Sequence, residues 1–317
     1  MKRILGAVCM PLLVATVVSL AGCDRSAKSG TGAFVVGITN VNDIYDYTVR
    51  FRNYLVEAAA ERGINVIVMN AAGDTSVQNG QIDDMIVRGV RVVSAIPIDM
   101  DGSIPGLEAA RAAKLPYVSF LTSVRDGEKY PGFIYVGSRN YDAGWKQGEY
   151  LAEILPQDAN IIYFTMHPND IQAIDRRTGF MDSMAKRPDV TFVVELNVQG
   201  RRDLAINATE DVIQSVARFD AIVAQNDDAA LGVVESLKAA GRLSDVVVVG
   251  LDGSPPALES IAAGELTMSV LQNPRAQAQA GADVFARIRN GTDPAAIEDV
   301  FVPFEIITMD NVARFME

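Results

Sequence analysis

The sequence predicts an α/β protein with two lobes, each built on a doubly wound parallel sheet. Three observations lead to this prediction. From residue 34 onward, short apolar segments alternate with amphipathic helical segments. The apolar segments are hydrophobic at successive positions, as in strands whose two faces are both covered by helices. The pattern then restarts near residue 160. Strand–helix repeats of this kind form parallel sheets.

The elements follow in order along each lobe. In the first lobe, helices end at stop signals such as Gly63 after Glu61-Arg62. The first lobe is expected to have strands at 34–38, 65–69, 91–96 and 117–121, and helices near 45–62, 75–88 and 103–113. The chain is expected to cross to the second lobe near 137–140. There, strands are expected at 160–164, 190–196, 220–224, 245–250 and 267–271, with helices between them.

Polar residues follow many of these strands. Ligands of open parallel sheets bind beyond the carboxyl ends of the strands. Two lobes whose strand ends face each other would therefore enclose a cleft lined with amide and carboxylate groups. The polar strand ends are Thr39-Asn40, Asn70, Gln225-Asn226-Asp227, Asp252-Gly253 and Gln272-Asn273.

Charge, composition and missing motifs argue against several functions. The net charge of −12 argues against nucleic-acid binding, which needs basic patches. We expect no cofactor, because Gly30-Thr31-Gly32 precedes the first strand instead of following it, and there is no P-loop. His167 is the only histidine, so no metal site is expected. An enzyme would also need a nucleophile elbow or a similar constellation, which is absent.

The N-terminus has the features of an export signal. Lys2 and Arg3 precede an apolar stretch, which ends in Leu20-Ala21-Gly22-Cys23. This ending resembles a bacterial lipobox, which implies cleavage before Cys23 and acylation of that cysteine; the alternative is an ordinary signal with a chance cysteine. We expect a signal over 1–22 and a tether over 23–33. The protein would then lie on the periplasmic face of the cytoplasmic membrane or on the extracytoplasmic cell surface, held by its lipid.

Four segments follow one another along the chain, namely Arg176-Arg177-Thr178-Gly179-Phe180 and residues 224–232, 248–253 and 270–274. In this order they resemble motifs of the periplasmic ribose-type (type I) sugar-binding proteins. Arg176-Arg177-Thr178-Gly179-Phe180 is similar to their "RxxGF" segment, and residues 224–232 to their "AQND…ALG" segment. Residues 248–253 are similar to "VGxDG", and residues 270–274 to a last strand that ends in glutamine. The resemblance covers roughly residues 33–310.

This resemblance implies a monomer whose two lobes are joined by three hinge crossings. Lobe one would comprise 34–138 plus about 273–301, and lobe two 139–272 plus about 302–317. The implied function is to bind a small hydroxylated ligand, a sugar or polyol, without catalysis and to deliver it to an ABC permease. Two alternatives stay open. One is a receptor that presents a ligand for chemotaxis or signalling, including a non-sugar ligand such as a quorum signal; the other is an α/β enzyme.

The resemblance also implies the ligand-binding residues of lobe two, namely Arg176, Asn226, Asp252 and Gln272. The chemistry of these groups agrees, since carboxylates accept hydroxyl hydrogens, guanidinium groups donate, and amides do both. Three of them have a structural alternative: Arg176 as a solvated helix charge, Asp252 as a turn residue and Gln272 as a hinge residue. Asp227 is expected to cap the helix over 228–240.

In lobe one, the family places a polar residue and two aromatics after the first strand. The candidates are Asn42 and Asp43 for the polar position and Tyr45 and Tyr47 for the aromatic ones, with surface or core positions as the alternative. This chain departs from the family at the end of the fourth strand, where ribose-binding relatives have Asp-Arg and this chain has Leu121-Thr122. That departure puts ribose itself in doubt. Arg125 and Asp126, slightly later, are candidates to replace the missing pair.

Overall fold

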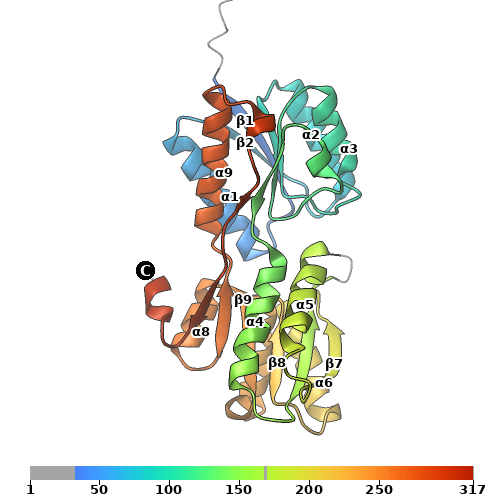
Figure 1. Cartoon of the computed structure of the whole chain (residues 1–317), viewed down its shortest axis with the longest axis vertical. Helices are drawn as coiled ribbons and strands as arrows, with labels where there is room; N and C mark the ends of the chain where they lie inside the picture. Colours follow the sequence, from blue (N-terminus) through green and yellow to red (C-terminus); the bar gives the residue numbers. More distant parts are fainter. Residues whose placement is uncertain (1–32, 168–169, 317) are drawn as a thin grey trace, which may run out of the picture. The chain divides into compact units, whose positions relative to one another are not determined.

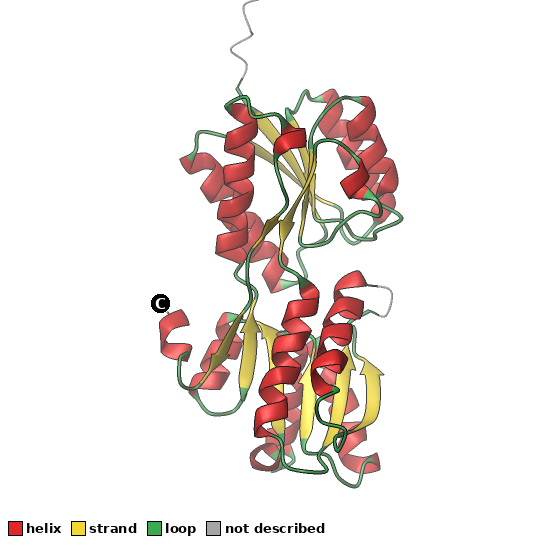
Figure 2. Ribbon diagram, viewed as in Figure 1, coloured by secondary structure: helices red, strands yellow, loops and turns green. Residues whose placement is uncertain are grey.

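The computed structural model describes residues 33–167 and 170–316. The predicted signal, the lipidation residue Cys23 and the tether up to residue 32 lie outside the described residues. In the described part of the chain, no helix is both long and apolar enough to cross a membrane. This part forms two six-stranded sheets with helices on both faces (Figure 1, Figure 2).

The first sheet has the order β11-β5-β4-β3-β1-β2, and all its strands run parallel. Helices α1 and α9 pack on one face, and α2 and α3 pack on the other. The strands are β1 (Val35–Asn40), β2 (Asn65–Asn70), β3 (Val92–Ala95), β4 (Tyr117–Phe120), β5 (Phe133–Gly137) and β11 (Val300–Phe301). The helices are α1 (Asp46–Glu61), α2 (Thr75–Val87), α3 (Ile104–Ala112) and α9 (Pro274–Arg289).

The second sheet has the order β12-β10-β9-β8-β6-β7. Helices α4 and α5 cover one face, and α6, α7 and α8 cover the other. The strands are β6 (Asn160–Thr165), β7 (Thr191–Asn197), β8 (Ala221–Ala224), β9 (Val247–Asp252), β10 (Met268–Leu271) and β12 (Glu305–Thr308). The helices are α4 (Asn140–Ile154), α5 (Ile171–Met184), α6 (Arg202–Ser215), α7 (Asp227–Ala239) and α8 (Pro255–Ala262).

The chain passes between the two sheets three times. It crosses from β5 to α4, returns from β10 to α9, and crosses again from β11 to β12. The predicted fold, two doubly wound lobes joined by three crossings, is confirmed. Helices on both faces bury the inner strands of each sheet, such as β3, β4, β8 and β10, which explains their continuous apolar sequences.

Two features of the sheets differ from the expectation. Strand β12 runs antiparallel to β10, with Met268 opposite Thr308, so the second sheet is mixed. Strands β5, β11 and β12 were not expected from the sequence. β11 has only two residues, and β12 follows β11 without a helix, so neither belongs to a strand–helix repeat. Mixed sheets with one antiparallel edge strand are common in doubly wound folds.

Candidate ligand-binding site

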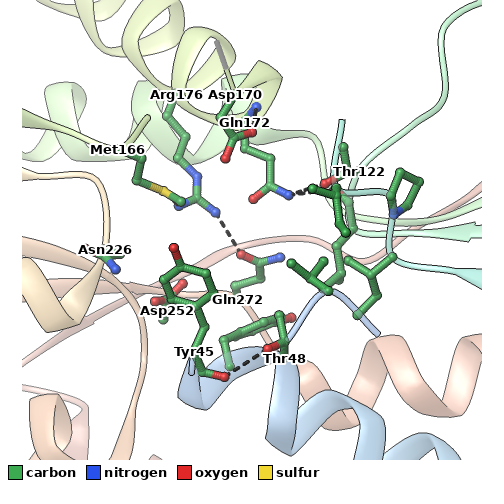
Figure 3. Close-up of a pocket in the computed structure, with 16 residues that line it drawn as sticks. Tyr45, Thr48, Thr122, Met166, Asp170, Gln172, Arg176, Asn226, Asp252 and Gln272 are labelled. Carbon is green, nitrogen blue, oxygen red and sulfur yellow. Dashed lines mark hydrogen bonds between the residues drawn. The ribbon is translucent and has the colours of Figure 1, made fainter. Parts of the chain in front are cut away.

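A cavity of about 130 Å³ lies beyond the carboxyl ends of strands from both sheets (Figure 3). Its two walls differ in chemistry. Lobe one contributes mainly apolar and aromatic groups, namely Val41, Tyr45, Tyr47, Thr48, residues 96–98, Leu121 and Thr122. Lobe two contributes mainly polar groups, namely Met166, Asp170, Gln172, Arg176, Asn226, Asp252 and Gln272. A cavity of roughly 150 Å³ holds one benzene molecule, so the volume suits a ligand with a single small ring.

Arg176 is the most constrained polar group of the cavity. Its side chain is buried, and Nη2 donates to Gln272 Oε1 at 3.0 Å (Figure 3). Nη1 donates to the Gln225 carbonyl oxygen at 2.7 Å, and Nε donates to Asn140 Oδ1 at 3.1 Å. These bonds connect α5 to the start of α4 and to the ends of β8 and β10, so the guanidinium is held in place before any ligand binds.

Close packing of α4 against α5 sets the position of the Arg176 backbone. A Cβ atom added to Gly144 would lie 1.7 Å from the Arg176 carbonyl oxygen, and one added to Gly179 would lie 2.0 Å from the Tyr141 carbonyl oxygen. Only glycine permits this approach of the two helices. These two glycines therefore place Arg176 at the cavity wall.

Asn226 both lines the cavity and begins α7. Its Oδ1 accepts a hydrogen bond from the Ala229 amide at 3.2 Å, and its Nδ2 donates to the Gly200 carbonyl oxygen at 2.8 Å. The prediction that Asp227 caps this helix was wrong. Asn226 is the cap, and the buried Asp227 carboxylate instead accepts from the Ser254 amide at 2.7 Å and from Ser269 Oγ at 2.6 Å.

Asp252, the last residue of β9, has an unusual backbone and an unpaired side chain. Its φ of +130° lies outside the usual range of residues other than glycine. Such strain is often found at functional sites. Its carboxylate forms no hydrogen bond with the described residues, although it lines the cavity. Burial, followed by the nearby charge of Asp227, raises the pKa of Asp252 to about 8. Because Asp227 accepts two hydrogen bonds, we assign the negative charge to Asp227 and the proton to Asp252.

This raised pKa predicts a stability that depends on pH. Between pH 4 and pH 8 the folded protein keeps a proton on Asp252 that the unfolded chain releases, so stability falls as pH rises through this window. The slope is at most about 1.4 kcal/mol per pH unit for one group. Asp252→Asn should flatten the slope and stabilise the empty protein near pH 8. Urea unfolding at several pH values measures this; the exposed Asp211→Asn on α6 is the control, and an unchanged slope in Asp252→Asn would contradict the assignment.

Tyr45 and Tyr47 both line the cavity, as the resemblance implied. Tyr47 also begins a chain of hydrogen bonds that leads to the hinge. Its hydroxyl donates to Gln277 Oε1, Gln277 Nε2 donates to Ser138 Oγ at 2.7 Å, and Ser138 Oγ donates to the Val302 carbonyl oxygen at 2.6 Å. Ser138 and Val302 lie in two of the three crossings. One cavity residue is thus bonded through Gln277 to the hinge.

The structure does not bring Asn42 and Asp43 to the cavity. Asn42 Oδ1 accepts from the Ile44 amide at 3.0 Å and so shapes the turn before α1. The exposed Asp43 carboxylate pairs with Arg52 and accepts from Asn70 Nδ2 at 2.8 Å. Asn42 is thus engaged within its own loop and Asp43 by residues of α1 and β2, and neither side chain lines the cavity.

The other predicted replacements also lie elsewhere. Arg125 forms an exposed ion pair with Asp101, and Asp126 pairs with Lys129, so this loop does not supply the missing Asp-Arg pair of the cavity. Thr122 takes that place instead. Its Oγ1 accepts from Gln172 Nε2 at 2.5 Å, a hydrogen bond between the lobes (Figure 3).

Several residues of the cavity were not predicted. Gln172 and Asp170 stand at the start of α5, where Asp170 accepts from the Gln172 amide, and Met166 follows β6. Their position in the segment after a strand end could have identified them as cavity residues, because the same position identified Asn226. His167 is exposed and does not line the cavity. The described residues contain no group of acidic, histidine and cysteine side chains that would hold a metal ion.

Residues 35–293 match the model of the periplasmic binding protein domain family. The chain is 28% identical to a xylitol-binding protein of Mycolicibacterium smegmatis, over 91% of this chain and 80% of that protein. It is 26% identical to the ribose import binding protein of Bacillus subtilis, over 84% and 86%. Among solved structures, an ABC transporter solute-binding protein from Bacillus halodurans with bound myo-inositol superposes with a TM-score of 0.85, at 26% identity, over 91% of this chain and 99% of that one.

These matches define a substrate-binding protein of the two-lobed type, a class whose members lie outside the cytoplasm. The chain belongs to the periplasmic binding protein family, and the predicted resemblance to its ribose-type members is confirmed.

Proposed function

We propose that this protein is the substrate-binding component of an ABC importer, and that it captures one sugar or polyol between its lobes without catalysis. The contrast between the two cavity walls carries this proposal. Apolar and aromatic side chains of lobe one suit the C–H face of a ring, while Arg176, Asn226, Asp252 and Gln272 of lobe two suit its hydroxyl groups.

Two of these polar groups have free hydrogen-bonding capacity among the described residues. The Asp252 carboxyl group has no hydrogen-bond partner among the described residues, and Gln272 uses its Oε1 for Arg176 while its Nε2 forms no bond. A hydroxyl group both accepts and donates, so it satisfies the Gln272 amide donor and the carbonyl oxygen of the Asp252 carboxyl group together. A ligand lacking such a hydroxyl would leave buried groups unpaired, and this is how polar sites discriminate strongly between ligands.

The relatives support the same ligand class, because their names specify xylitol, ribose and myo-inositol. Since the cavity is lined by both lobes, a bound ligand contacts both and favours the closed arrangement. An ABC permease would then recognise the closed arrangement by contacting the surfaces of both lobes.

We also propose that Cys23 carries a lipid that anchors the protein outside the cytoplasm. Comparing membrane and soluble fractions of the wild type and Cys23→Ser tests the anchor, and equal partitioning would exclude it.

A thermal-shift screen of the purified protein against monosaccharides, polyols, nucleosides and amino acids tests the ligand class. A ligand at about a thousand times its Kd adds roughly 4 kcal/mol to the free energy of unfolding. For a protein of this size, this raises Tm by about 10 °C. We expect such a shift for at least one sugar or polyol.

The control is a pair of matched substitutions. Asp252→Asn preserves shape but replaces one carboxyl oxygen with an NH2 group that donates and cannot accept, so it should reduce the shift, whereas the distant Asp211→Asn should preserve it. A shift only with amino acids or nucleosides would overturn the sugar assignment. The absence of any shift, in protein refolded from urea to release a co-purified ligand, would overturn the whole proposal.

A further inference from the structure

A second, smaller cavity of about 50 Å³ adjoins the ligand cavity, and we call it the side chamber. Four residues line both spaces, namely Tyr45, Tyr47, Asn226 and Asp252. The side chamber is bounded further by Asp46 and Arg50 of α1 and by Asp227, Asp228, Ser254 and Pro256 of lobe two. It therefore extends the ligand site toward a region rich in charge.

Arg50 brings an unused hydrogen-bond donor to this chamber. Its Nε donates to Asp46 Oδ2 at 2.6 Å. Neither Nη1 nor Nη2 forms a hydrogen bond with the described residues, and Nη2 is buried. A buried charged donor without a partner costs free energy unless a bound group satisfies it.

The acidic groups of the chamber differ in their availability. The Asp227 carboxylate already accepts from Ser254 and Ser269, and Asp228 lies 3.8 Å from Arg202. Only the Asp252 carboxyl group lines both spaces without a hydrogen bond to the described residues. A group entering the chamber therefore meets one free cationic donor and one free carboxyl group.

Arg50 and Asp252 determine which substituent of a ligand can bind in the side chamber. A hydroxyl accepts from the guanidinium and donates to the carbonyl oxygen of the Asp252 carboxyl group, so it satisfies both. A carboxylate substituent would be repelled by the surrounding aspartates, an ammonium group cannot accept from Arg50, and a methyl group would leave both unpaired. One water occupies about 30 Å³ in the liquid, so the side chamber has room for about one hydroxymethyl group.

We propose that Arg50 is a specificity-determining residue which, together with Asp252, holds the exocyclic hydroxyl group of a neutral sugar or polyol in the side chamber. This inference rests on the proposed function. It narrows the ligand class to molecules that carry a hydroxymethyl arm on a ring or chain that fills the main cavity. It also predicts that uronates and amino sugars bearing their charge on that arm are rejected.

Sugars that differ only in this arm test the proposal. D-galactose, D-fucose, L-arabinose and D-galacturonate share one ring stereochemistry and carry hydroxymethyl, methyl, hydrogen and carboxylate in turn. Sugars with the ring stereochemistry of D-glucose or of D-allose provide the same comparison. The corresponding pentoses are D-xylose for the glucose series and D-ribose for the allose series. Calorimetry on the purified full-length protein gives Kd for each. In the series that binds, we expect the hydroxymethyl member to bind about tenfold to a hundredfold more tightly than the others, the range of a charge-assisted hydrogen bond.

Arg50→Met keeps the length of the side chain and removes its donors. It should abolish the preference for the hydroxymethyl member while leaving the Kd of the pentose within about threefold. Arg52→Met is the matched control. Arg52 lies on the same helix, pairs with Asp43 outside both cavities, and should leave the preference intact. Comparing the Tm of the empty variants shows that each is folded.

The outcomes separate this inference from the proposed function. If the wild type binds only pentoses or inositols, or binds the deoxy sugar equally well, the chamber holds only water and the inference fails while the proposed function stands. Equal weakening of every sugar by Arg50→Met would also overturn it, because Arg50 would then affect closure and not selectivity. If no sugar or polyol binds at all, both fail.

Discussion

Arg176→Met should weaken ligand binding by at least about a hundredfold and lower the free energy of unfolding by about 3 kcal/mol. The guanidinium lines the cavity and supplies charge-assisted hydrogen bonds, which contribute about 1.5–3 kcal/mol each. Its removal also leaves Asn140 Oδ1, the Gln225 carbonyl oxygen and Gln272 Oε1 without their donor. Calorimetric titration with the ligand found in the screen, together with urea unfolding, measures the two effects.

The next residue provides the control. Arg177 pairs with Glu195 at 2.9 Å on the exposed side of α5, and exposed pairs of this kind contribute between zero and about 1 kcal/mol. Arg177→Met should therefore leave Kd unchanged and stability nearly so. If Arg176→Met bound ligand with the wild-type Kd, the side chain would serve only to connect α5 to its neighbours.

Gly144→Ala should destabilise the protein by about 3 kcal/mol, the upper end of the usual cost of overpacking. The added methyl group would overlap the Arg176 carbonyl oxygen, which is backbone and cannot rotate away. The helices α4 and α5 must then separate. Because α5 carries Arg176, we also expect a weaker affinity for ligand, which the same titration detects.

Gly80→Ala is the matched control. Gly80 lies within α2, and an added methyl group would meet nothing within 4 Å. Alanine has the higher helix propensity, so this variant should be as stable as the wild type or more stable by up to about 1 kcal/mol. A Gly144→Ala protein that unfolds at the wild-type urea concentration would show that the close approach of the two helices is dispensable.

The sequence was sufficient for the repeating part of the fold, because a strand buried on both faces and a helix after it leave a clear pattern. Strands β1 to β4 and β6 to β10 fall within a few residues of their expected positions. Strand β12 breaks that pattern, since it pairs in the opposite direction and follows a strand without an intervening helix. The position of β12 depends on its pairing with β10, which is distant in sequence. The local sequence around β12 does not reveal this pairing.

The residues of the site also divide into those that the sequence predicts and those that it does not. Arg176, Asn226, Asp252 and Gln272 stand on regular elements or directly after strands, so the fold alone determines where they lie. The residues after β1 lie in a loop, where distant contacts decide the direction of each side chain. Arg52 and Asn70 draw Asp43 outward, and no local signal in the sequence reveals this.

The third crossing has a consequence for the order in which the protein folds. Residues 300–308 supply β11 as an edge strand of the first sheet and β12 as an edge strand of the second. Domains of most proteins fold as units, beginning with the N-terminal one while the rest is still being made. Here neither lobe can complete its sheet until residues 300–308 have been synthesised. The two lobes therefore complete their sheets at the same stage of synthesis, and the N-terminal lobe does not fold fully ahead of the other.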